Sequence, residues 1–224
     1  SLDNITFKNV VGYRKLDFDQ VMDLDGVPAY LINSNRYRSI EQFSEEFQIQ
    51  GKAIENRLDY VLGAYYFVEK GKDGSTSSQF PELAIAGSGL PLNTPAATFL
   101  NAYAGSGKAK TFALFAAGTY AFTDQFKVSA GIRYTTDKRN ARILAYYPNL
   151  GTCLFRVDTG TTSFVPATLA DCPQTNSKKW DAFTWDVTLQ YEPNANLTTY
   201  ISTRRGFRSG GFSLRAASTE ELRP

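Results

Sequence analysis

The fold is decided by residues 112–135, which read FALFAAGTYAFTDQFKVSAGIRYT. On both sides of a short polar turn at 123–125, the side chains alternate in character with a period of two. After the turn, one row consists of Phe126, Val128, Ala130, Ile132 and Tyr134, and the other of Lys127, Ser129, Gly131, Arg133 and Thr135. Because successive side chains of a β-strand point to opposite faces, this pattern predicts two antiparallel strands joined by a tight turn.

The same alternation recurs along the chain, most clearly at 58–68 and 183–191. No apolar run approaches the roughly 20 residues that a membrane-spanning helix needs. We therefore expect an all-β chain whose strands run up and down in sequence. The seven expected strands cover about 4–16, 40–51, 57–70, 109–122, 125–147, 180–192 and 196–206.

The connections between these strands alternate between short and long. Short polar turns fall at 52–56, 123–125 and 193–196, whereas the long stretches 17–39, 72–108 and 148–179 are rich in Gly, Ser, Thr, Asn and Pro. Compact soluble domains seldom use structureless loops beyond about 12–15 residues. Outer-membrane barrels have short periplasmic turns and long external loops, with aromatic residues at both lipid boundaries. The pattern therefore favours a transmembrane β-barrel segment.

Aromatic side chains and strand length support the membrane interpretation. Phe122 and Phe126 flank one short turn and Tyr191 flanks another, where a girdle of rings would be needed. The strand expected at 125–147 exceeds the roughly 9–11 residues that cross lipid, so it would project above the membrane.

An odd number of strands indicates an open sheet. Antiparallel barrels of the bacterial type close with an even number of strands, and open edges are costly in lipid. The chain shows no signal peptide and ends abruptly at Arg223-Pro224. We therefore expect a truncated piece of a barrel, open because strands are missing from it.

Composition excludes several classes of function. The chain has no His, two Cys, and 24 basic against 22 acidic residues. Histidine-dependent triads, imidazole-ligated zinc and four-thiolate metal sites are therefore excluded within it. Nearly balanced charge argues against a nucleic-acid binder. No nucleophile–base pair appears either, so we expect neither an enzyme nor a cofactor.

Two segments resemble the barrels of TonB-dependent receptors. Residues 115–139, FAAGTYAFTDQFKVSAGIRYTTDKR, fit the family's strand–turn–strand pattern, although Ala117 stands where many members carry Gln. Residues 200–213, YISTRRGFRSGGFS, fit its Arg-Gly-Phe-Lys-Ser-Gly-Gly-Phe-Asn pattern, with Ser213 in place of Asn. The second motif comprises Arg205, Gly206, Phe207, Arg208, Ser209, Gly210, Gly211 and Phe212, with Arg208 replacing Lys.

The resemblance implies what the chain would do. Residues 1–224 would be a partial receptor barrel without the plug domain, the signal peptide and the C-terminal strands. The parent protein would lie in the outer membrane of a Gram-negative bacterium, among outer-membrane lipid and lipopolysaccharide. It would import a ferric siderophore, cobalamin or an oligosaccharide with energy from the TonB complex, and its barrel would enclose the plug of the same chain.

Candidate functional residues lie on the polar rows. Five of them face inward in the expected register and could contact the plug or an anionic ligand; the alternative is that they are ordinary wall residues in water or ion pairs. They are Arg133, Asp137, Asp186, Gln190 and Arg204. Arg204, Arg205 and Arg208 form a basic cluster in sequence, which could contact a ferric siderophore or lipopolysaccharide phosphate. Gly210 and Gly211 are expected to permit a bend or bulge at the top of the strand.

Two further groups lie in the expected external loops. Cys153 and Cys172 could form a disulfide, which oxidising surroundings favour; the alternative is two free thiols. Four acidic residues crowd the first loop, but their spacing lacks the EF-hand pattern, so we expect a solvated acidic loop rather than a Ca²⁺ site. They are Asp17, Asp19, Asp23 and Asp25.

Two rival interpretations remain open from the sequence. One is a passive diffusion porin, which has no plug and does not need TonB. The other is a secreted, soluble, carbohydrate-binding β-sandwich, which also alternates. The sandwich makes a clear structural prediction, because it would bury the row from Phe126 to Tyr134 against a second sheet.

Overall fold

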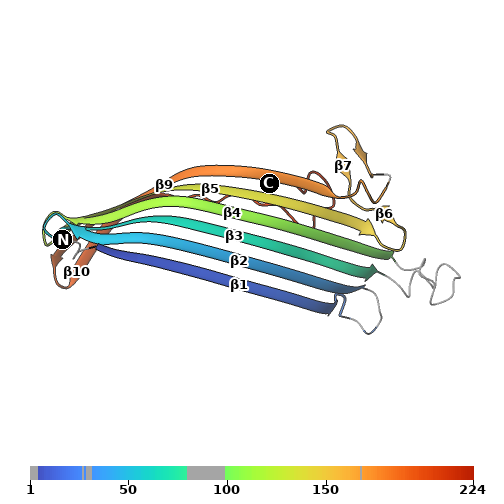
Figure 1. Cartoon of the computed structure of the whole chain (residues 1–224), viewed down its shortest axis with the longest axis horizontal. Coiled ribbons are helices and arrows are strands. Elements are labelled where there is room, and N and C mark those ends of the chain that lie inside the picture. Colours follow the sequence, from blue (N-terminus) through green and yellow to red (C-terminus); the bar gives the residue numbers. More distant parts are fainter. Residues whose placement is uncertain (1–4, 27, 29–31, 80–98, 167) are drawn as a thin grey trace.

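The structure, a computed structural model, describes residues 5–26, 28, 32–79, 99–166 and 168–224. One long antiparallel sheet dominates it, and its strands follow one another in chain order (Figure 1). The long strands are β1 (Ile5–Asp23), β2 (Ile32–Ala53), β3 (Leu58–Gln79), β4 (Phe99–Ala121), β5 (Phe126–Tyr147), β9 (Gln174–Asn194) and β10 (Leu197–Arg205). Within the described residues, no helix has the length and apolar character of a membrane span.

The sheet is a meander with two free edges. Its order is β1-β2-β3-β4-β5-β9-β10, so β1 and β10 form the edges and do not pair with each other. The expected all-β, up-and-down, open segment of seven long strands is therefore confirmed. Three two-residue strands lie between β5 and β9: β6 (Thr152–Cys153) extends the sheet at β5, while β7 (Val157–Asp158) and β8 (Ser163–Phe164) form a small ribbon.

The strand boundaries differ from those expected. β2, β3 and β5 each have 22 residues and β4 has 23, so strand covers much of 17–39 and 72–108, where the sequence predicts loops. In the third expected loop, β9 starts at Gln174. The reason is physical: the added residues are mostly Ser, Thr, Asn, Gly, Lys and Arg, and a strand that water wets on both faces needs no apolar row.

The first acidic cluster is also not a loop. Asp17, Asp19 and Asp23 belong to β1, and only Asp25 lies beyond it. The Asp25 carboxylate accepts a hydrogen bond from the backbone amide of Ile32 at 2.6 Å, and the Asp23 carboxylate accepts one from the amide of Asp25 at 3.2 Å. These carboxylates stabilise the β1–β2 connection, and the part of the chain that the structure describes contains no group of three or more acidic, Cys or His residues placed to hold a metal.

One face of the sheet is apolar and uncovered. Leu62 on β3, Leu114 on β4, Ile132 and Tyr134 on β5, and Phe183 on β9 share this face and are between 46% and 51% exposed. A soluble β-sandwich would bury this row against a second sheet, and the described residues form no second sheet over it. We call this the outer face, and the opposite one the inner face.

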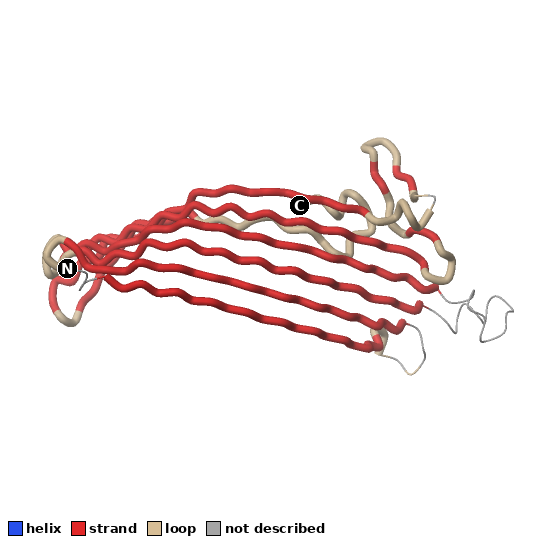
Figure 2. The backbone as a smooth tube through the Cα atoms, in the orientation of Figure 1, coloured by secondary structure: helices blue, strands red, loops and turns tan. Residues whose placement is uncertain are grey.

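The buried core lies on the inner face, toward the long-loop end. There the chain after β10, residues 206–224, turns back across the sheet as an irregular segment, drawn in tan in Figure 2. We call it the inner tail. Ile143 of β5 and Ala216 and Leu222 of the inner tail pack there against Phe155 and the Cys153–Cys172 disulfide. Loop, tail and sheet therefore meet in a small core at this end of the described chain.

Candidate functional site on the inner face

The inner tail is seated directly on the sheet. Leu214 lies over Gly105 of β4, where a Cβ atom in place of hydrogen would come within 2.4 Å of the Leu214 carbonyl oxygen. Gly210 lies against Trp180 of β9, whose ring is 6.4 Å from that of Phe212. Any side chain at Gly105 would push the tail away, so this glycine is required for close approach rather than for a turn.

A cluster of charged side chains around one buried carboxylate anchors the inner tail to β3. Asp73 of β3 is 6% exposed and accepts hydrogen bonds from Arg36 at 3.1 Å and from Arg38 Nε at 3.0 Å. Arg215 of the inner tail approaches the second carboxylate oxygen of Asp73 at 3.5 Å. Three guanidinium groups thus surround one carboxylate, so the cluster keeps a surplus of positive charge.

The loop between β5 and β9 holds the far end of the tail. The backbone amide of Arg156 donates to the Ala217 carbonyl at 2.8 Å, and the amide of Thr219 donates to the Arg156 carbonyl at 3.0 Å. The Asp158 carboxylate accepts a hydrogen bond from the Ser163 hydroxyl, which holds the pKa of Asp158 below its usual value, and Arg156 nearby acts in the same direction. The loop and the tail therefore form one unit.

Two of the predicted inward residues are engaged with the wall itself. The Arg133 guanidinium lies over the rings of Tyr65 and Phe115, at 5.4 Å and 5.7 Å from their centroids. Asp137 is 5% exposed and pairs with Arg139 at 3.2 Å. These contacts hold both side chains against the sheet and stabilise it, so neither side chain has much freedom to reach a ligand.

The other three predicted inward residues lie nearer the short turns. Asp186 of β9 pairs in register with Arg204 of β10, so both lie on the inner face. Gln190 donates to Glu192 on the same strand. Asp186 also lines a hollow of about 780 Å³ together with Gln48, Gln50, Thr119 and Ser129. This part of the inner face is therefore a polar surface, rich in amide and hydroxyl groups.

The three arginines of the sequence cluster are not brought together. Arg204 and Arg205 are neighbours on β10 and so point to opposite faces, while Arg208 lies in the exposed start of the inner tail. β10 ends at Arg205, opposite Trp185 in the apolar part of the sheet, so these residues do not lie at the external end. Gly210 and Gly211 belong to the tail, which is irregular, so the expected bend or bulge within a strand is not found at these two described positions.

The residues that sequence reasoning missed are Asp73, Arg36, Arg38 and Arg215. The i, i+2 spacing of Arg36 and Arg38 places both on one face of a strand. That signal is present in the sequence, but the stretch lacks an apolar row and is predicted as loop, so its pairing with β3 is not foreseen. Arg215 carries no signal, because only the folded tail brings it to Asp73.

Comparison with known proteins agrees with this architecture. The chain matches the family described as TonB dependent receptor-like, beta-barrel, over residues 1–224. Comparison with curated protein sequences gives no match. Among solved structures, it is similar to the ferric yersiniabactin uptake receptor FyuA from Yersinia pestis, with a TM-score of 0.70 and 14% identity over 97% of this chain and 28% of that one.

The chain is also similar to a second solved structure. The siderophore receptor PiuA from Acinetobacter baumannii has a TM-score of 0.59 and 17% identity over 89% of this chain and 29% of that one. The chain thus spans less than a third of the length of these receptors. At such identities the likeness shows the fold alone, whereas the family match covers every residue. The family consists of transporters and not enzymes, and the chain belongs to it as a TonB-dependent receptor-like β-barrel.

Proposed function

We propose that this chain is part of the wall of an outer-membrane receptor that takes up a ferric siderophore with energy from TonB. The family match supports the receptor class and the Gram-negative outer membrane. The two similar structures, a ferric yersiniabactin uptake receptor and a siderophore receptor, suggest the ligand class.

The observation that carries the proposal is the contrast between the two faces. The outer face presents exposed Leu, Ile, Phe and Tyr side chains, which suit contact with lipid. The inner face presents Arg133, Asp137, Asp186, Gln190 and Arg204, which suit a hydrated interior. A wall of this kind separates lipid from a wide, polar lumen.

In this proposal, further strands and a plug domain would complete the barrel. The free edges of β1 and β10 carry unpaired backbone groups, each of which costs several kcal/mol in hydrocarbon. Further strands of the same parent chain would pair with them and close the barrel. The hollow lined by Gln48, Gln50 and Asp186 offers hydrogen-bonding groups to a plug inside it. TonB would act on that plug from the periplasmic side.

Iron-limited growth tests the proposal. Deleting the complete receptor gene should abolish uptake of radiolabelled ferric siderophore for at least one member of a siderophore panel, and a strain lacking TonB should show the same loss. Restored uptake from a plasmid copy of the gene is the control. Uptake that persists without TonB would instead identify a diffusion porin. A defect confined to cobalamin or an oligosaccharide would replace the ligand class and keep the transport mechanism.

A further inference from the structure

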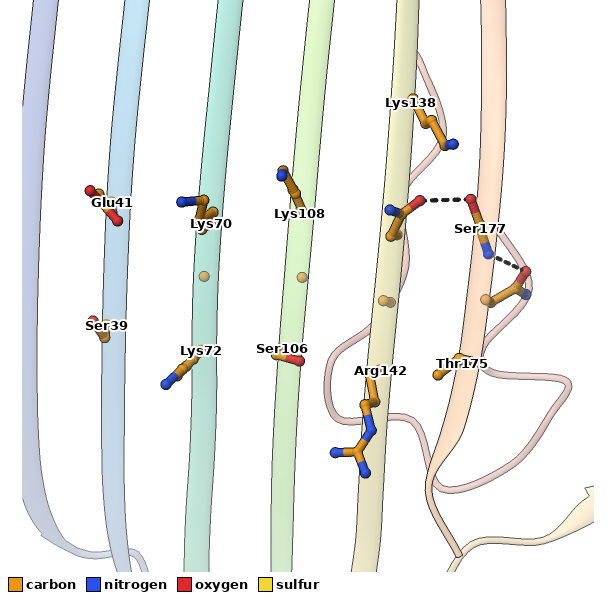
Figure 3. Close-up of a pocket in the computed structure, with 15 residues that line it drawn as sticks. Ser39, Glu41, Lys70, Lys72, Ser106, Lys108, Lys138, Arg142, Thr175 and Ser177 are labelled. Carbon is orange, nitrogen blue, oxygen red and sulfur yellow. Dashed lines mark hydrogen bonds between the residues drawn. The ribbon is translucent and has the colours of Figure 1, made fainter. Parts of the chain in front are cut away.

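A belt of basic side chains crosses the outer face of the sheet beyond the apolar row. Five of its members line a hollow of about 880 Å³ on β3, β4 and β5, and Figure 3 shows them on neighbouring strands. They are Lys70, Lys72, Lys108, Lys138 and Arg142. Glu41 is the only acidic residue among the described residues that line this hollow. With Lys110 and Lys179, which lie in register beside them, we call these basic residues the outer belt.

The register places like charges directly opposite each other. Lys70 pairs with Lys108, Lys110 pairs with Lys138, and Lys138 pairs with Lys179 on the next strand. Directly opposed like charges destabilise a sheet. Among the described residues, only Lys179 of the belt has an ion-pair partner, Asp181 at 3.2 Å. The belt therefore keeps an excess of positive charge, and an anion from outside the described chain would relieve the repulsion.

The position of the belt indicates which anion that is. On β4, Lys110 precedes the apolar residue Phe112 by two positions on the same face, a distance of about 7 Å along the strand. The apolar row from Phe112 to Phe122 is long enough to cross a membrane. The tight turns at the Phe122 end of this row are of the periplasmic kind, so in an outer-membrane barrel the belt would lie at the level of the external lipid headgroups.

The hollow also offers neutral hydrogen-bonding groups beside the cations. Ser39, Ser106 and Thr175 line it, and Asn140 accepts a hydrogen bond from the Ser177 hydroxyl at 2.6 Å, as drawn in Figure 3. Lysine binds phosphate as a point charge, while hydroxyl and amide groups suit sugar hydroxyls. The combination fits a phosphorylated sugar better than a bare ion.

We propose that the outer belt binds the phosphate groups of lipopolysaccharide from the outer leaflet. Lipopolysaccharide supplies all three features that the site requires: phosphates at the headgroup level, sugars beside them, and acyl chains that continue along the apolar row below. The inference rests on the outer-membrane location in the proposed function, but the site lies on the opposite face from the inner tail and does not depend on the transported ligand, so a failure to find siderophore uptake would leave it standing.

Binding of lipid A by the complete, delipidated receptor in detergent tests this site. The K108Q/K110Q/K138Q variant should bind bis-phosphorylated lipid A at least tenfold more weakly than the natural protein, measured by native mass spectrometry. A matched control, K52Q/R57Q/K127Q, removes three positive charges at the short-turn end and should change binding less than twofold. An equal loss in both variants would overturn the proposal.

Two further measurements remove the ambiguity of a misfolded variant. The natural protein should bind lipid A whose phosphates have been removed at least tenfold more weakly than the intact lipid; equal binding would disprove the phosphate site. Without lipid A, the belt variant should melt no lower than the natural protein, because it removes opposed charges. A belt variant that melts lower would show that these lysines stabilise the wall itself, contrary to the argument from repulsion.

Discussion

The two halves of the sheet differ in what holds them in place. Toward the short turns, each strand has an apolar outer row and a polar inner row, and the described sheet is a single layer there. Toward the long loops, polar residues are frequent on both faces, and β5, the loop after it and the inner tail form a small buried core. In the proposed outer-membrane receptor, lipid would stabilise the first half, whereas protein contacts stabilise the second.

A charge on the outer face should be harmful only in the lipid half. Ala116 of β4 lies between the exposed apolar residues Leu62 and Ile132 of the neighbouring strands. Ala116→Arg should destabilise the complete receptor in lipid vesicles by about 2–4 kcal/mol, measured by guanidinium unfolding. Ser106→Arg, on the same face of the same strand but beside the outer belt, should cost less than about 1 kcal/mol. Equal effects would mean that the two halves share one environment.

Loss of the disulfide should affect only the long-loop half. Cys153 and Cys172 are 19 residues apart in sequence, and both are buried in the small core. The double variant Cys153→Ser/Cys172→Ser should destabilise this loop by about 2–3 kcal/mol, since a short closed loop gives that much in the chain-entropy model. Protease cleavage within 148–173 should accelerate while the barrel melts unchanged. A lowered barrel melting temperature would couple the halves.

The ion cluster should fix the inner tail to the wall. Asp73→Asn leaves Arg36, Arg38 and Arg215 without their shared carboxylate, and their partial exposure to water limits the loss to about 1–2 kcal/mol. Hydrogen exchange within 206–224 should rise. The control is Asp181→Asn on the outer face, which removes an exposed ion pair and should leave the tail unaffected. No change in exchange would show that Leu214 and Phe212 hold the tail alone.

Acid should loosen the loop–tail unit slightly. The hydrogen bond from Ser163 lowers the pKa of the half-buried Asp158 carboxyl below its ordinary value of 3.8. A group whose pKa is lower in the folded state stabilises above its unfolded pKa and loses that contribution as pH falls through the folded value. Exchange in 157–164, corrected for its intrinsic pH dependence, should therefore rise only below about pH 4. Asp158→Asn should remove this dependence.

The strands of the half near the short turns can be predicted from sequence because apolar and polar side chains alternate there with a period of two. The rows from Phe112 to Phe122 and from Phe126 to Tyr134 alternate with small and polar residues, as expected where one face of a sheet meets hydrocarbon and the other meets water. The parts of β2, β3 and β4 nearest the long loops have no such alternation, and their composition predicts loops instead. There, the strands pair by continuing the register that is set near the short turns, and no local sequence pattern predicts that pairing.

The candidate site divides in the same way. Arg133, Asp137 and Asp186 can be placed on the inner face because they lie within or beside alternating rows. The Arg36–Arg38–Asp73–Arg215 cluster cannot, because it joins two upper strands to a segment without periodicity. The Cys153–Cys172 disulfide can be predicted from sequence because the chain contains only two cysteines, which leaves one possible pairing.

The inner tail acts as a brace across the wall. It is fixed to β3 through Arg215, to β4 at Gly105 and to β9 at Trp180, so it spans strands that are not neighbours. Each ladder of hydrogen bonds joins only adjacent strands and permits them to pivot about it. A brace fixed at three strands removes that freedom, so the upper half of this wall should bend as one panel.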